Sequence, residues 1–186
     1  MSRARRTVIA AAVALAALVT LLSSGPAAAS GDAGHDRSNV VATFEGSVIH
    51  LADGWGEAQA CASDDGRTAR CYRSEAEMDA VEAESAVPGW SRGGIARAAC
   101  SGPLRLYRAA NYGGSVLQLS VQGQYINLAG YGFDNDTSSY RIGPCGARFY
   151  DTATGGGLYP GSTTAGASSP TMAAGWDNRI SSIRIL

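Results

Sequence analysis

The chain has 186 residues, 45% of them hydrophobic, and a formal net charge of −1 at pH 7. All 15 basic residues are arginine, and they form no basic run beyond the N-terminus, so we do not expect nucleic acid as a partner. His35 and His50 are the only histidines, which argues against a Ser-His-Asp triad or a histidine-rich zinc site, and no phosphate loop or nucleotide fingerprint is present. We therefore expect a protein that is not an enzyme.

Residues 1–29 have the features of a secretory signal peptide. A basic start is followed by an apolar run from Val8 to Leu22 and by the small-residue cleavage site Ala27-Ala28-Ala29. The alternative is a membrane anchor, but the apolar run is shorter than the roughly 20 residues that cross a bilayer. We expect a secreted, extracellular protein with no membrane segment after cleavage.

The stretch after the cleavage site divides into two segments. Residues 30–39 are polar and without periodicity, which predicts a disordered start of the mature chain. Residues 40–98 are predicted to form a small disulfide-closed segment. Within it, the β-prone stretches 40–44 and 47–51 predict a β-ribbon.

A short acidic helix is predicted later in the same segment. Ser74 and Glu77 have the spacing of a capping box, and residues 75–85 are rich in helix formers before Pro88. We interpret the acidic side chains of this helix as a solvent-exposed face.

The four cysteines follow the signal peptide, and an even number in an exported small protein predicts two disulfides rather than a metal cluster. Three pairings are possible. We favour a local loop closure, Cys61–Cys71, and a longer link, Cys100–Cys145. The reason for the second pair is that each cysteine precedes an aromatic residue, Tyr107 or Tyr150, by a few positions.

An internal duplication starts near residue 99. The hexapeptides Asp134–Ser139 (DNDTSS) and Asp177–Ser182 (DNRISS) lie 43 residues apart, and the same offset relates Tyr107 to Tyr150. Short alternating β stretches bounded by turn residues occur in both copies. They predict an all-β domain of two similar halves, with strands near residues 104–107, 116–119, 140–142 and 183–185.

Each hexapeptide combines carboxylate, amide and hydroxyl oxygens, which are the ligands that Ca²⁺ prefers. Asp and Asn also tolerate the left-handed backbone conformations that turn carbonyls inward. A single copy is explained by ordinary turn chemistry, whereas two copies in phase favour calcium. With so few carboxylates we expect a dissociation constant of about 10⁻⁵ to 10⁻³ M. Ser63 lies outside these motifs, and we expect its replacement to have no effect.

The first repeat reads aromatic, four residues, aromatic, any residue, glycine from Tyr107 to Gly114. This resembles the Greek-key signature of the βγ-crystallin superfamily, and the two hexapeptides resemble its microbial calcium motif. The second repeat departs from the signature, because Gly155 stands where the second aromatic is expected, although Gly157 is in place. The resemblance covers about Cys100 to Leu186.

The resemblance implies an all-β, double Greek-key β-sandwich over residues 99–186, preceded by the small α+β N-terminal segment. The two keys would span residues 100–143 and 144–186, each contributing a sheet-forming set of strands. It also implies two calcium sites at one end of the sandwich, each borrowing groups from both hexapeptides.

In the resemblance, the third residues of the motifs, Asp136 and Arg179, would give main-chain carbonyls. The fifth residues, Ser138 and Ser181, would give hydroxyl oxygens. An acid or amide from the first two positions would reach across to the partner site (Asp134, Asn135, Asp177, Asn178). Arg179 places a positive charge near one cation, so we expect the two sites to differ in affinity.

We expect a secreted calcium-binding protein in which the ion mainly stabilises the fold. One alternative is a secreted metalloprotease inhibitor, since an exported bacterial inhibitor family shares the crystallin fold; its partner would be an extracellular protease. The other is a cell-wall or glycan-binding module, which needs an exposed row of aromatic side chains. Candidates for such a row are Trp55, Trp90, Tyr112, Tyr125, Tyr131 and Tyr159. The oligomeric state does not follow from the sequence.

Overall fold

The computed structural model describes residues 39–85 and 102–186, which all fall within one compact unit. The predicted signal peptide, nearly all of the stretch predicted to be disordered, Trp90 and Cys100 lie outside these ranges. In the part of the chain that is described, no helix is long and apolar enough to span a membrane.

The described residues are mostly β-structure, with one α-helix, α1 (Glu75–Ser85). Three short 3-10 turns are η1 (Leu51–Asp53), η2 (Ala110–Tyr112) and η3 (Leu128–Tyr131). The strands are β1 (Val41–Phe44), β2 (Ser47–His50), β3 (Ala60–Ser63), β4 (Thr68–Tyr72), β5 (Leu104–Ala109), β6 (Gly113–Leu119), β7 (Ile126–Asn127), β8 (Ser139–Arg141), β9 (Ala147–Tyr150), β10 (Ser168–Ser169) and β11 (Ser182–Ile185). The predicted β-ribbon, short helix and mainly β repeat region are all present.

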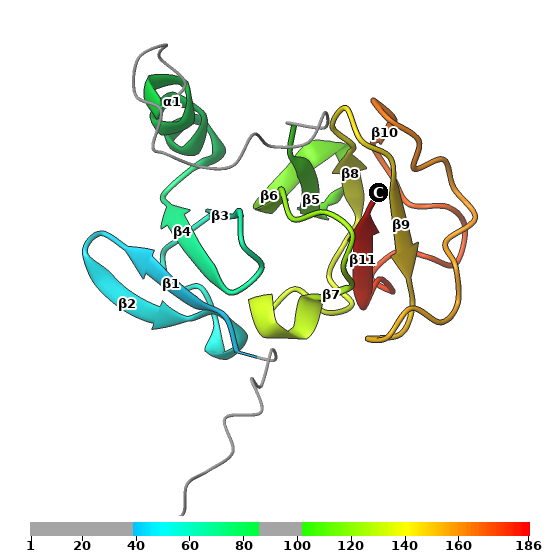
Figure 1. The fold of residues 1–186 in the computed structure, drawn as a ribbon, viewed down its shortest axis with the longest axis horizontal. Coiled ribbons are helices and arrows are strands. Elements are labelled where there is room, and N and C mark those ends of the chain that lie inside the picture. The colour runs from blue at the N-terminus through cyan, green and yellow to red at the C-terminus, as the bar shows by residue number, and fades with distance from the viewer. Residues whose placement is uncertain (1–38, 86–101) are drawn as a thin grey trace, which may run out of the picture. The chain divides into compact units, whose positions relative to one another are not determined.

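Two sheets are formed, and the repeats exchange strands between them (Figure 1). The larger sheet has the order β10-β8-β5-β6-β3-β4-β1-β2, and the smaller has the order β7-β11-β9. Strand β10 of the second repeat pairs with β8 of the first, and β7 of the first pairs with β11 of the second. Neither key therefore forms a complete sheet from its own strands, because β7 and β10 each pair with a strand of the other key.

The N-terminal strands extend the larger sheet. Strand β3 pairs in parallel with β6, in the register Ala60↔Val116 to Ser63↔Leu119, and β4, β1 and β2 follow outward. The sequence delimits residues 40–98 by composition, but their described strands continue the sheet of residues 102–186. An uncovered β6 would leave a row of unpaired backbone groups, and β3 satisfies them.

One hydrophobic core joins both repeats with the N-terminal segment. Leu51 and Trp55 belong to the same buried cluster as Phe133, Phe149 and Ile183. A contiguous apolar cluster of this kind is what defines a single domain core. We therefore regard the N-terminal strands as part of the folded unit that carries the hexapeptides.

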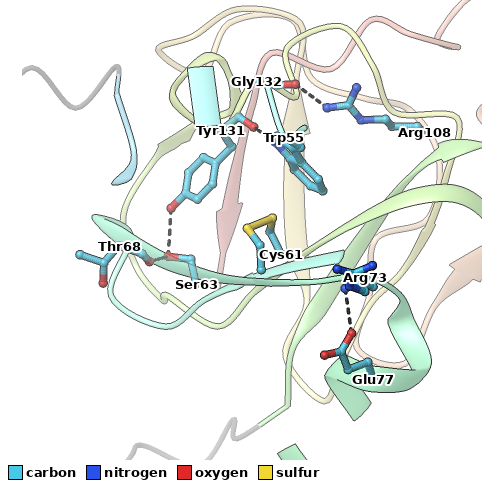
Figure 2. The surroundings of a disulfide bond; sticks show 10 residues. Trp55, Cys61, Ser63, Thr68, Arg73, Glu77, Arg108, Tyr131 and Gly132 are labelled. Atoms are coloured by element: carbon cyan, nitrogen blue, oxygen red, sulfur yellow. Dashed lines mark hydrogen bonds between the residues drawn. A yellow bond between two sulfur atoms is a disulfide. The ribbon is translucent and has the colours of Figure 1, made fainter. Parts of the chain in front are cut away.

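Helix α1 lies on a second, smaller apolar cluster. Its Met78 is fully buried and packs with Tyr72 of β4, Tyr107 of β5 and Val116 of β6. At its start the Glu77 main-chain N–H donates to Ser74 Oγ at 3.1 Å, as the capping box predicts. The Glu77 carboxylate accepts a bond from the Arg73 N–H at 2.9 Å, as Figure 2 shows.

The solvent-exposed acidic face is present only in part: Glu77, Asp79 and Glu84 are exposed, whereas Glu75 and Glu82 are half-buried. Arg105 of β5 forms ion pairs with Glu75, at 2.7 Å, and with Asp79. Glu75 also accepts a hydrogen bond from the Tyr107 hydroxyl at 2.7 Å, and Glu82 accepts one from Gln118. Helical spacing in the sequence predicts which residues share a face of the helix. It does not predict whether that face contacts water or an arginine on a neighbouring sheet.

The predicted disulfide Cys61–Cys71 is present and joins directly paired residues of β3 and β4. Cys145 is also disulfide-bonded, but its predicted partner Cys100 lies outside the described residues, so that pairing stays a prediction. Ser63, whose replacement was expected to have no effect, is buried; the effect itself stays a prediction, but the structure gives a reason to expect a loss of stability. Its Oγ donates to the Thr68 carbonyl at 2.7 Å and accepts from the Tyr131 hydroxyl at 3.2 Å, as Figure 2 shows.

Tyr125 fills the place of the aromatic residue that the second repeat lacks. In the first repeat the rings of Tyr107 and Tyr112 pack edge to face, 5.6 Å apart. In the second, Tyr150 packs against Tyr125 at 5.5 Å. A Cβ atom on Gly155 would lie 2.3 Å from Tyr125 Cε1, so glycine makes room for this ring.

We predict that Gly155→Ala destabilises the protein by about 1–3 kcal/mol more than Gly166→Ala, as measured by urea unfolding. Both glycines have positive φ, 92° and 73°, so both substitutions strain the backbone, but only Gly155 faces a neighbouring ring. Adding Tyr125→Ala to the first variant should remove the difference. Equal losses in the two single variants would contradict this account of the corner.

We also predict a loss of stability at high pH. Burial raises the pKa of Tyr107 and of Tyr131 to about 12, and the Glu75 carboxylate adds to the effect at Tyr107. In the unfolded chain both ionise near pH 10. Their contribution is thus fully present below pH 10 and is lost as the pH rises through 12. Absorbance titration of folded and urea-unfolded protein tests this, with Tyr107→Phe and Tyr131→Phe to assign each step; ionisation near pH 10 in the folded protein would refute it.

Candidate metal centre

The two hexapeptides occupy equivalent loops, one leading into β8 and the other into β11. Asn135 and Asn178, the second residue of each motif, have positive φ values of 53° and 54°. Asparagine enters this left-handed region more readily than most residues, which explains why the same Asp-Asn pair builds the same turn twice. Each loop is also fixed to its own repeat, because Ser138 N donates to Tyr107 O and Ser181 N to Tyr150 O, both at 2.8 Å.

The loops are hydrogen-bonded to each other through the main chain. Asn135 N donates to Ile180 O at 3.0 Å, and Asn178 N donates to Thr137 O at 3.1 Å. The 43-residue offset converts one bond into the other. The two motifs, which are far apart in the chain, therefore lie against each other in a reciprocal arrangement.

Side-chain oxygens from the two motifs meet in two pairs. Ser138 Oγ donates to Asn178 Oδ1 at 3.2 Å, and Ser181 Oγ donates to Asn135 Oδ1 at 3.4 Å. Both serines are largely buried, with 7% and 8% of their surface exposed, whereas the asparagines are exposed. The sequence leaves open which of the first two positions reaches across, and in the structure it is the asparagine in both cases.

The first acids of the motifs take no part in these pairs. Asp134 is exposed, and its carboxylate accepts a bond from the neighbouring Asn135 amide at 3.2 Å. Asp177 is also exposed and has no ion-pair partner among the described residues. From the sequence, either the aspartate or the asparagine could reach across to the other motif. In the part of the chain that the structure describes, only the asparagine does so.

The main chain of both loops also carries carbonyl oxygens without a hydrogen-bond donor in the described part of the chain. Within the described ranges, no group donates to the carbonyls of Asp136 and Arg179, the third residues of the motifs. Thr137, which sequence reasoning did not single out, has a buried hydroxyl with no hydrogen-bond partner there. Buried polar groups normally find a partner, so this hydroxyl marks unmet hydrogen-bonding capacity within the first loop.

Each loop forms an ion pair with its own repeat, and the positions of the arginine and the aspartate are exchanged between the two pairs. In the first repeat Arg108 Nη1 lies 2.8 Å from Asp136 Oδ2, and in the second Arg179 Nη2 lies 2.9 Å from Asp151 Oδ2. The offset relates position 108 to 151 and position 136 to 179, so arginine and aspartate have changed places. The charge of Arg179 is thereby balanced by Asp151, which weakens the reason to expect unequal sites.

Arg108 and Asp151 were missed from the sequence. Each arginine also lies over the aromatic ring before its motif: Arg108 is 4.9 Å from the Phe133 ring, and Arg179 is 5.0 Å from the Trp176 ring. Aligning the repeats would have shown opposite charges at both pairs of positions. That pattern is a signal for a paired contact.

The candidate centre is poor in charge. No group of three or more His, Cys, Asp or Glu side chains that could hold a metal occurs in residues 39–85 and 102–186. The side-chain oxygens that meet between the loops are hydroxyls and amides, while Asp136 is paired with Arg108. Such a donor set suits a hard cation held at modest affinity.

The aromatic residues proposed for glycan stacking do not form an exposed row. Trp55, Tyr131 and Tyr159 are buried in the core. Tyr125 is 45% exposed, but its ring packs on Tyr150. Trp90 lies outside the described residues. The described residues therefore give the glycan-binding alternative no support.

No protein-family model and no curated protein matches the sequence. Among solved structures, a βγ-crystallin from Ciona intestinalis matches at 25% identity, covering 46% of this chain and 100% of that one, with a TM-score of 0.37. Domains from Flavobacterium johnsoniae and Clostridium beijerinckii match at 26% and 16% identity, covering 45% of this chain and 92% and 97% of theirs, with TM-scores of 0.34 and 0.37. Identities and scores are low, so any functional inference depends on the residues of this chain. The chain matches βγ-crystallin domains over slightly less than half of its length.

Proposed function

We propose that this chain is a secreted, non-catalytic protein that binds two calcium ions between its hexapeptide loops, and that the ions mainly stabilise the fold. The observation that carries the proposal is the pair of reciprocal contacts, Ser138 with Asn178 and Ser181 with Asn135. Each contact brings together two neutral oxygens from different repeats. A cation placed there would tie the repeats to each other.

Each ion would be held by three protein oxygens of different kinds. The Ser138 hydroxyl, the Asn178 amide oxygen and the Asp136 carbonyl would hold the first. The repeat-related groups, from Ser181, Asn135 and Arg179, would hold the second. Calcium takes roughly six to eight oxygens, so water and further carbonyls would complete each shell.

The donor chemistry favours calcium over other cations. Zinc and copper prefer imidazole or thiolate, whereas the convergent side-chain groups here are hydroxyls and amides. Magnesium demands near-ideal octahedral geometry and sheds water reluctantly, while calcium accepts irregular shells of neutral oxygens. Loops built on Asp-Asn turns supply such an irregular shell.

We predict that the chelated mature protein binds about two Ca²⁺ and melts at higher temperature in calcium. Binding to the native state alone gives about 2.7 kcal/mol at a hundredfold excess over Kd, or about 5–10 °C for a chain of this size. Isothermal titration and a thermal scan measure both quantities. No heat and no shift at millimolar calcium would refute the proposal, and inhibition of a thermolysin-like protease in the same sample would favour the inhibitor alternative.

We further predict that Ser138→Ala and Ser181→Ala each weaken one site by about tenfold or more, because each removes a hydroxyl ligand. Calcium-free stability should change little, since the lost bonds reach partly exposed amides. Ser47→Ala, on the exposed face of β2, is the matched control and should bind calcium as the wild type does. Unchanged calcium titrations in both site variants would show that these serines are not ligands.

A further inference from the structure

Arg108 connects the N-terminal segment to the first hexapeptide loop. Its Nη1 is paired with Asp136 Oδ2 at 2.8 Å, and its Nη2 donates to the Gly132 carbonyl at 2.8 Å. Its guanidinium lies 4.9 Å from the ring centroids of both Trp55 and Phe133. Figure 2 shows Arg108 reaching the Gly132 carbonyl near Trp55. A single side chain thus contacts the N-terminal segment, the stretch before the loop and the loop itself.

Trp55 is held firmly in this arrangement. Its Nε1 donates to the Tyr131 carbonyl at 2.7 Å, its ring lies 5.6 Å from that of Phe133, and only 6% of the residue is exposed. The neighbouring backbone is close as well, because a Cβ atom on Gly132 would lie 2.3 Å from the Leu51 carbonyl oxygen. The residues immediately before Asp134 are therefore covered by residues of the N-terminal segment.

The second loop has an equivalent ion pair and ring contact, and in the described part of the chain these involve only residues of the second repeat. Arg179 pairs with Asp151 and lies over Trp176. Trp176 in turn packs against Tyr159 at 5.4 Å. All four residues belong to the second repeat. Among the described residues, only the first loop has a tryptophan from the N-terminal segment beside its arginine.

We propose that Arg108 is a positioning residue that couples the packing of residues 40–55 to calcium binding at the site of Ser138 and the Asp136 carbonyl. The proposal rests on the proposed function. Arg108 holds the Asp136 side chain and so limits the conformations of its carbonyl, and docked Trp55 limits those of Arg108. A pre-ordered ligand costs less entropy to bind, and calcium must stabilise the N-terminal packing in return, since coupling is reciprocal.

An effect of Arg108 on calcium binding can be distinguished from an effect on stability alone. The Arg108–Asp136 pair is about one-third exposed on both sides, and pairs this exposed contribute little to stability. Replacing Arg108 with glutamine removes the charge and keeps most of the side-chain length. The repeat-related Arg179→Gln provides a control, because it breaks an equivalent pair whose contacts, within the described residues, lie in the second repeat.

The experiment combines isothermal calcium titration with hydrogen exchange on the mature chain. In the wild type, calcium should slow exchange both in residues 40–55 and in β9. In Arg108→Gln, one of the two binding steps should weaken about fivefold, and calcium should no longer slow exchange in residues 40–55 while still doing so in β9. Arg179→Gln should retain the calcium response of residues 40–55. Trp55→Phe, which removes the donor to Tyr131, should change the response in the same direction as Arg108→Gln.

The outcomes distinguish this inference from the proposed function. Calcium binding with no calcium response of residues 40–55 in the wild type overturns the coupling and leaves the proposed function standing. A response that survives both Arg108→Gln and Trp55→Phe also overturns it. Absence of calcium binding in the wild type overturns the proposed function and the coupling together.

Discussion

The reciprocal contact between the two hexapeptide loops is the constraint on which the candidate centre depends. Two main-chain bonds, from Asn135 to Ile180 and from Asn178 to Thr137, fix the loops against each other. Once they are fixed, the serine of each motif necessarily lies beside the asparagine of the other. The exchange of β7 and β10 between the repeats serves the same end, because it prevents either repeat from moving away as a unit.

The N-terminal segment covers one edge of the duplicated region and brings additional residues close to one hexapeptide loop. It covers the β6 edge with β3 and adds Leu51 and Trp55 to the shared core. The disulfide Cys61–Cys71 fixes the β3–β4 hairpin, and Ser63 closes its turn while bonding to Tyr131. Helix α1 is then held over the outer face of the sheet through Arg105 and Met78. These contacts place residues from outside the duplication within reach of one loop.

The sequence was sufficient for features that repeat or are local. The capping box at Ser74 was predicted because its spacing defines it, and the disulfide Cys61–Cys71 was favoured among three pairings as the local loop closure. The strand exchange, the role of Tyr125 at Gly155 and the contacts between the acidic side chains of α1 and the sheet were not predicted, because each depends on which distant surface lies opposite. For the candidate centre, the motif indicated which kinds of oxygen are available, while the contact of asparagine rather than aspartate with the opposite serine required the positions of both loops.

The exchanged ion pairs have a consequence for comparing the two halves. Positions 108 and 151 are equivalent in the two halves but carry opposite charges, and so do positions 136 and 179. A residue-by-residue comparison of the halves therefore counts two mismatches. The contact between them is nevertheless the same in each half. The two halves thus make an equivalent ion pair with the arginine and the aspartate at exchanged positions. Kinship between such halves is therefore better measured by covarying pairs of positions than by residue identity.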